Sequence, residues 1–174
     1  MTRAVEPLRR LDPAEYDDDM EAWIRLVDGM HHGANHRVNP EASFAPLPGP
    51  LSELRVALVT TAGVHLADQE PFHTETVAGD ATVRVLPDDL DPSELRFSHT
   101  HYDTSAAEED HNVVFPLDRL HELAERGRIG GATPYHLGMM GFNPDPTRIA
   151  EEAAPRAVEL LGEAGAEAVV FVPG

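Results

Sequence analysis

An unbroken apolar run, Leu54-Arg55-Val56-Ala57-Leu58-Val59-Thr60-Thr61, constrains the fold of this chain more than any other feature of its sequence. A strand with one face in water alternates apolar and polar residues, whereas a strand covered on both faces is apolar throughout. The run is rich in β-branched residues and ends in the small pair Ala62-Gly63, which suits a tight turn. It therefore predicts a central strand of a parallel sheet with helices on both faces.

The rest of the chain continues this pattern. Further strands are predicted at 82–86, 95–101 and 166–172, and helices at 116–127 and 147–163. Strands that alternate with helices are typical of an α/β protein. We expect a three-layer sandwich with a mainly parallel, Rossmann-like sheet.

The N-terminal part has a different character. Met20, Trp23, Ile24 and Val27 form one apolar stripe of a short predicted helix, and a stiff proline-rich connector spans residues 46–50. We interpret residues 1–50 as a helical arm and residues 51–174 as one α/β domain. A total of 174 residues fits a single domain of ordinary size.

Composition excludes several functional classes. The formal charge of −18 argues against nucleic-acid binding, which needs a cationic patch. The absence of cysteine excludes a disulfide scaffold, a zinc ribbon and a thiol nucleophile within these residues. Lysine is absent too, and there is no phosphate-binding loop or nucleotide fingerprint. No apolar stretch approaches the roughly 20 residues that cross a bilayer, so we expect no membrane partner and a cytoplasmic location.

A cluster of histidines and carboxylates is the strongest chemical signal. Alternate residues of an extended chain share a face, so His99, His101 and Asp103 are predicted to line up where the strand at 95–101 ends. Asp110 or His111 can complete the group. Such a set can hold zinc, iron or manganese, or it can bind substrate and transfer protons without a metal.

A second group follows the first strand, because ligands of parallel sheets bind beyond the carboxyl ends of the strands. The Thr60 and Thr61 hydroxyls can bind a carboxylate, and Gly63 permits close approach of the backbone, although these residues can equally just finish the strand and make the turn. His65 can reach the site from the following loop. His136, in a glycine-flanked segment, is a candidate for the pocket wall.

Several segments resemble one known family. The segments Pro50–His65, Ser98–Asp103 and Asn112–Leu120 are similar to the selenoprotein B family of glycine, sarcosine, betaine and D-proline reductases. The region from Gly130 to Gly141 and the final helix and strand resemble it as well. The resemblance is collinear over roughly residues 50–174.

The resemblance implies an α/β reductase subunit. Family members cleave a C–N bond reductively with a selenocysteine or cysteine, and some work with a pyruvoyl-bearing partner subunit while thiols or a thioredoxin-type system supply electrons. In the family, that selenocysteine or cysteine directly follows the strand that ends here at Val172-Pro173-Gly174, and it is not present in this sequence. Either the sequence is cut at a selenocysteine codon that was read as a stop, or the protein is complete and works without a thiol.

We therefore expect an oxidoreductase subunit that acts on a small amino-acid-like substrate. His99, His101, Asp103 and His111 are its expected catalytic residues, and the substrate-binding residues are those of the second group. The alternatives are a thiol-free metal-dependent lyase, hydrolase or oxygenase that uses the same four residues as ligands, and a non-catalytic binding subunit. A partner reductase subunit and a homo-oligomer are also expected, since the last strand would otherwise form an uncovered sheet edge.

Overall fold

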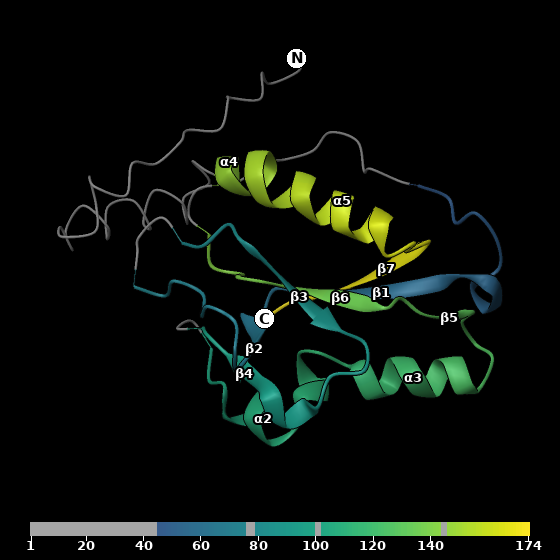
Figure 1. Ribbon diagram of the computed structural model, residues 1–174, viewed down its shortest axis with the longest axis horizontal. Helices are drawn as coiled ribbons and strands as arrows, with labels where there is room; N and C mark the ends of the chain where they lie inside the picture. Colours follow the sequence, from purple (N-terminus) through teal and green to yellow (C-terminus); the bar gives the residue numbers. More distant parts are fainter. Residues whose placement is uncertain (1–44, 76–78, 100–101, 144–145) are drawn as a thin grey trace, which may run out of the picture.

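The computed structural model describes residues 45–75, 79–99, 102–143 and 146–174 (Figure 1). The predicted N-terminal helix and most of the predicted arm lie outside these residues. The division into an arm and an α/β domain therefore stays a prediction.

The main sheet is built around β1 (Arg55–Thr60), which is the predicted central strand. It pairs in parallel with β5 (Gly131–Ala132), β6 (Tyr135–Met139) and β7 (Ala168–Val172), while β3 (Val83–Pro87) pairs antiparallel with β6. Since β7 accompanies β1 along almost its whole length, β5 and β6 share the opposite edge of β1 one after the other. The expectation of a mainly parallel sheet is confirmed.

Helices cover both faces of this sheet (Figure 1). On one face, α4 (Pro146–Arg148) leads through a π-helical turn, Ile149–Ala153, into α5 (Ala154–Glu163). On the other face lie α2 (Ser105–Glu109) and α3 (Leu117–Glu125). Short 3-10 turns occupy Leu51–Glu53, Pro92–Glu94 and His111–Val113. None of the helices in the described part of the chain is both long enough and apolar enough to cross a membrane.

Two apolar cores lie on the two sides of β1, which explains why the strand is apolar throughout. Leu58 belongs to the core that also contains Leu117 and Leu120 of α3, and Val59 belongs to the core that contains Ala157 and Leu160 of α5. Every residue from Val56 to Thr60 is buried. Burial on both faces, predicted from the sequence, is therefore confirmed, whereas the Rossmann-like connectivity stays a prediction.

The segment after β1 differs from the prediction. The strand predicted at 95–101 is short, β4 (Leu95–Phe97), and it pairs antiparallel with β2 (Val64–Leu66) in a separate two-stranded sheet. Gly63 reverses the chain here with a φ of +68°, a backbone conformation that strongly favours glycine. At the end of the β2–β4 pairing, the Ser98 N–H donates a hydrogen bond to the Gly63 carbonyl at 2.9 Å. The chain therefore leaves the strand before it reaches His99.

The region from Gly130 to Phe142 also differs, since no strand is predicted there and it contributes β5 and β6. Gly138 explains why a glycine-containing strand fits here. A Cβ at Gly138 would collide with the Val64 carbonyl oxygen, so the absence of a side chain lets β2 pass directly over β6.

Candidate functional site

The carboxyl ends of β1, β6 and β7 meet at one edge of the sheet. The Thr61 N–H donates to the Val172 carbonyl at 3.0 Å, and the Gly63 N–H donates to the Met139 carbonyl at 2.9 Å. The Gly174 N–H donates to Thr61 Oγ1 at 3.2 Å. This is the edge at which open α/β sheets bind ligands.

The loop after β4 is fixed against the same edge. The Tyr102 hydroxyl donates to the Ala62 carbonyl at 2.9 Å, and the rings of His99 and Tyr102 pack at an interplanar angle of 50° with their centroids 4.6 Å apart. Burial raises the pKa of the Tyr102 hydroxyl above its ordinary value, and the Glu108 carboxylate adds to that effect. The phenol therefore stays neutral and keeps donating to the end of β1.

Gly141 brings a histidine and a hydroxyl together at this edge. A Cβ at Gly141 would lie 2.8 Å from the Thr61 carbonyl oxygen and 3.4 Å from both His99 Nε2 and Thr61 Oγ1. The absence of a side chain at Gly141 thus lets Thr61 and His99 approach the same point of the glycine backbone. We call Thr61, His99, Tyr102 and Gly141 the strand-end site.

The other predicted catalytic residues lie elsewhere or outside the described residues. Asp103 is exposed and accepts a hydrogen bond from the Ser105 N–H at the start of α2, and the bonds from Ser105 hold the pKa of this carboxyl below its usual range. His111 is half-buried, with Nε2 3.6 Å from Asp118 Oδ2. His101 lies outside the described residues. Of the predicted set, the structure places His99 alone in the strand-end site.

The metal hypothesis gains no support from the arrangement of these groups. Within the described ranges, no three histidine or carboxylate side chains come together in a way that could hold a metal ion. Asp103 precedes α2 and accepts from the Ser105 N–H, whereas His111 follows α2 in the chain and lies beside Asp118. The binding of zinc, iron or manganese by His99, His101, Asp103 and His111 stays a prediction.

The two threonines that follow one another in β1 have different environments. Thr60 is fully buried, and its Oγ1 accepts a hydrogen bond from the Ala62 N–H at 3.2 Å, which caps the strand. Thr61 is half-buried and presents its hydroxyl at the strand-end site. Thr60 therefore fits the structural interpretation, whereas Thr61 is the residue to which the functional interpretation can apply.

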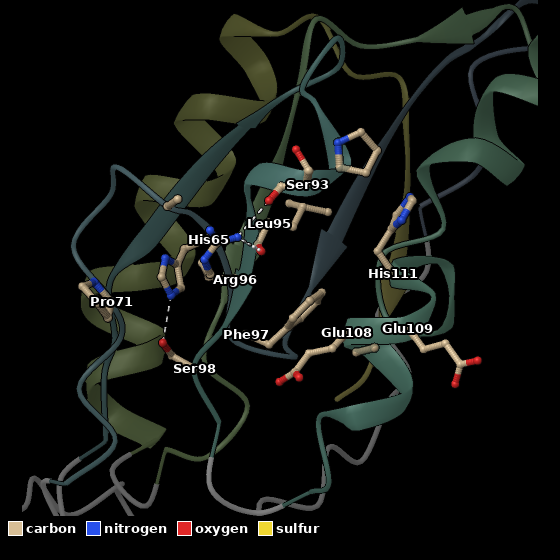
Figure 2. A pocket seen from close by; sticks show the side chains of 13 residues that line it. His65, Pro71, Ser93, Leu95, Arg96, Phe97, Ser98, Glu108, Glu109 and His111 are labelled. Carbon is tan, nitrogen blue, oxygen red and sulfur yellow. Dashed lines mark hydrogen bonds between the residues drawn. The ribbon is translucent and has the colours of Figure 1, made fainter.

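A cleft of about 800 Å³ lies beside β2 and β4 (Figure 2). We call it the β2–β4 cleft; residues along its walls include His65, Leu95, Arg96, Phe97, Ser98 and His111. His65 Nε2 lies 2.8 Å from Ser98 Oγ, and His65 Nδ1 lies 2.8 Å from the Leu66 carbonyl oxygen. Of the predicted residues, His65 and His111 thus belong to this cleft.

His136 lies inside the main sheet. It is fully buried, its Nδ1 accepts a hydrogen bond from the Leu58 N–H at 3.0 Å, and its Nε2 lies 2.9 Å from Asp88 Oδ1. His121 Nε2 contacts the same carboxylate oxygen at 2.8 Å. Burial lowers the pKa of His136 more than Asp88 raises it. Its described partners are therefore the sheet and Asp88.

Three residues of these sites were not singled out from the sequence: Ser98, Tyr102 and Gly141. Ser98 and Tyr102 belong to the segment Ser98–Asp103 that carries the family resemblance, so their closeness to His99 in the sequence could have identified them as candidate site residues. Gly141 gave no signal of its own, because its importance depends on the approach of two side chains from other segments.

The structure is that of an α/β protein in which the carboxyl ends of parallel strands meet at one edge of the main sheet. A family model described as glycine/sarcosine/betaine reductase selenoprotein B matches residues 30–173. The chain belongs to this family, as the sequence resemblance predicted.

A named relative is the D-proline reductase subunit gamma of Acetoanaerobium sticklandii, which is 32% identical over 151 residues. The alignment covers 87% of this chain and 61% of the relative, so the chain spans about three-fifths of that protein's length. No solved structure matches the chain.

Proposed function

We propose that this chain is a subunit of a reductase of the glycine, sarcosine, betaine or D-proline type, and that it binds a small amino-acid-like substrate at the strand-end site. The observation that carries the proposal is the convergence of Thr61 and His99 above Gly141. Two segments that carry the family resemblance thereby meet at the edge where α/β proteins bind ligands.

The chemistry of the site suits such a substrate. The Thr61 hydroxyl can donate to a carboxylate, and His99 can hold or move a proton beside it. Tyr102 supports the His99 ring by a tilted ring contact, and its hydroxyl donates to the Ala62 carbonyl. His101, Asp103 and His111 remain proposed catalytic residues; Thr60, Gly63, His65 and His136 remain proposed contributors to substrate binding.

The electrons must come from outside these 174 residues, because the sequence contains no cysteine. The family resemblance points to a thiol or selenol as the reductant. We therefore propose that a partner reductase subunit, or another polypeptide segment, brings this group to the strand-end site. A cytoplasmic location, a homo-oligomer and Rossmann-like connectivity complete the proposal.

The test is substrate binding by the purified chain. Glycine, sarcosine, betaine and D-proline are titrated separately in a calorimeter into the wild type and into Thr61→Val, His99→Gln and His73→Gln. His73 is the matched control, because its side chain is 65% exposed and lies outside the strand-end site.

We expect at least one of the four to bind with a Kd near or below about 1 mM. The Thr61 and His99 variants should weaken that binding about 10-fold or more, as the loss of one hydrogen bond to a charged group predicts, and the control should stay within about 2-fold. Failure of all four compounds to bind, or equal binding by every variant, would overturn the proposal.

A further inference from the structure

We infer that His65 and Ser98 form a proton relay that opens into the β2–β4 cleft. A proton passes between His65 Nε2 and a basic atom of a small ligand in the cleft, and the Ser98 hydroxyl lies between the two. The cleft is distinct from the strand-end site, and the identification of its ligand as a molecule of the same amino-acid-like class rests on the proposed function, whereas the relay itself rests on the geometry of the two side chains.

The hydrogen bonds of His65 fix the position of its proton. A backbone carbonyl can only accept a hydrogen bond, so the Nδ1 atom, 2.8 Å from the Leu66 carbonyl oxygen, carries a hydrogen. A neutral imidazole has a single N–H, and Nε2 therefore presents its lone pair. Because Nε2 lies 2.8 Å from Ser98 Oγ, the serine hydroxyl donates to it. His65 is thus held as a base that faces Ser98.

Burial makes Ser98 the route between His65 and the cleft. His65 is only 4% exposed, and its ring also packs edge-on against Phe72 with centroids 6.1 Å apart. Ser98 is half-buried and lines the cleft, and Figure 2 shows its hydroxyl at the end of the contact with the His65 ring. A group in the cleft can therefore reach the Ser98 hydroxyl.

The local fold accounts for the meeting of these residues. His65 lies directly opposite Arg96 in the β2–β4 ladder, and Ser98, two residues beyond Arg96, falls on the same face. A Cβ at Gly63 would collide with the Ser98 carbonyl oxygen. The glycine that makes the turn after β1 therefore also permits the approach that sets the relay.

The step is a proton transfer alone, so no group is oxidised or reduced and no bond to carbon forms or breaks. When His65 is protonated, its Nε2 proton moves to Ser98 Oγ as the Ser98 hydroxyl proton moves to the ligand, and the reverse step returns both. An amine nitrogen or a carboxylate oxygen can serve as the accepting atom. The charged or titratable groups around the cleft are Arg96, Glu108, Glu109 and His111.

The first measurement uses nitrogen-15 NMR of the full chain to follow the ring protons of His65. We compare the wild type with Ser98→Ala, Ser98→Thr and the control Ser93→Ala, whose serine lines the same cleft without contacting His65. The neutral ring should carry its proton on Nδ1. In the protonated ring, which also carries a hydrogen on Nε2, exchange of the Nε2 proton with solvent should slow at least about 5-fold in Ser98→Ala and stay within about 2-fold in the other two variants.

A merely structural serine predicts the opposite sign, because the smaller alanine uncovers Nε2 and exchange becomes faster. Unchanged or faster exchange in Ser98→Ala, or a neutral ring with its proton on Nε2, would overturn the relay. Since no ligand is needed, this result is decisive even if the proposed function fails.

The second measurement connects the relay to the ligand. Binding of sarcosine and of D-proline is measured by calorimetry in buffers of different ionisation enthalpy, which gives the number of protons exchanged on binding. We expect a proton linkage in the wild type that falls by at least half in Ser98→Ala and persists in Ser98→Thr. Binding with the same linkage in Ser98→Ala would overturn proton transfer to the ligand. Absence of binding alongside the expected NMR result would overturn the proposed substrate class and leave the relay standing.

Discussion

At the scale of single residues, His136 shows how a buried polar side chain can complete a sheet. β5 and β6 follow one another along the same edge of β1, and the chain between them passes through Thr133 and Pro134. In this interval the Leu58 N–H donates to His136 Nδ1. A buried N–H without an acceptor would cost about 1–3 kcal/mol, so the imidazole stabilises the centre of the sheet.

This role requires neutral His136, which predicts a dependence of stability on pH. A protonated ring carries a hydrogen on Nδ1 and cannot accept from Leu58. Burial lowers the pKa of His136 in the folded chain below its ordinary value of 6.5, so near and below this pH the unfolded chain binds more protons. The contribution of His136 is thus complete above 6.5 and declines as the pH falls toward the folded-state value. Its slope can reach about 1.4 kcal/mol per pH unit.

The comparison of the wild type with His136→Asn in urea unfolding at pH 5.5, 6.5 and 7.5 tests this prediction. Asparagine keeps an acceptor but does not titrate. We expect the variant to be less stable at pH 7.5 by about 1–3 kcal/mol, because the contact of the imidazole with Asp88 is lost, and we expect the difference from the wild type to shrink toward pH 5.5. A constant difference across the three pH values would show that protonation of His136 does not matter.

At the scale of elements, β6 depends on a glycine that separates it from β2. A Cβ at Gly138 would collide with the backbone oxygen of Val64, and neither strand can move without disturbing the pairing of β6 with β1 and β3. Gly162, near the end of α5, is the opposite case, because a Cβ there would meet nothing. The two glycines form a matched pair within one chain.

Gly138→Ala should lower the free energy of unfolding by about 2 kcal/mol or more, since overpacking against a backbone atom forces the strands apart. Gly162→Ala should raise it by up to about 1 kcal/mol, because alanine restricts the unfolded chain and favours a helix. Urea unfolding of both variants and the wild type measures the two changes. Equal effects of the same sign would contradict this account.

The elements also show what the sequence can and cannot predict. β1, α3, the helical region up to Glu163 and β7 have strong apolar patterns of their own, and each appears where it was predicted. β2 and β6 do not, because their existence depends on a turn at Gly63 and on close packing at Gly138. The short β4 follows the same rule: its apolar start was predicted, but its end is set by the hydrogen bond from Ser98 to Gly63.

The candidate site was predictable to a similar extent. The residue types and the edge of the sheet followed from the sequence, and His99 and Thr61 do meet there. The alternation that aligned His99 with Asp103 presupposed an extended chain beyond residue 97, whereas β4 ends at Phe97. Contacts that form only after the chain leaves a regular element carry no periodic signal, which is why the packing of Tyr102 against His99 emerged only from the structure.

At the scale of the whole molecule, repulsion between strongly negative copies of the chain opposes their association through an exposed apolar strand edge. Among the described strands, β7 pairs with β1 alone, and Phe171 on it is 72% exposed. Exposed strands with apolar side chains are templates for association with other chains. A net charge of −18 at pH 7 keeps copies of the chain apart by repulsion. Self-association should therefore depend on whether attraction at the β7 edge or repulsion between the negative charges is stronger.

Acidification should shift this balance, because the net charge vanishes near the isoelectric point of about 4.7. We expect light scattering to rise as the wild type is brought from pH 7.5 to about 5.2. Phe171→Lys should reduce the rise at least about 5-fold, because it places a charge on the strand that a second chain would have to cover. Val158→Lys on α5 is the control, since Val158 is 71% exposed and the substitution changes the charge by the same amount. If the edge of β7 governs association, the control should change the rise by less than about 2-fold; equal suppression by both variants would assign the effect to net charge alone.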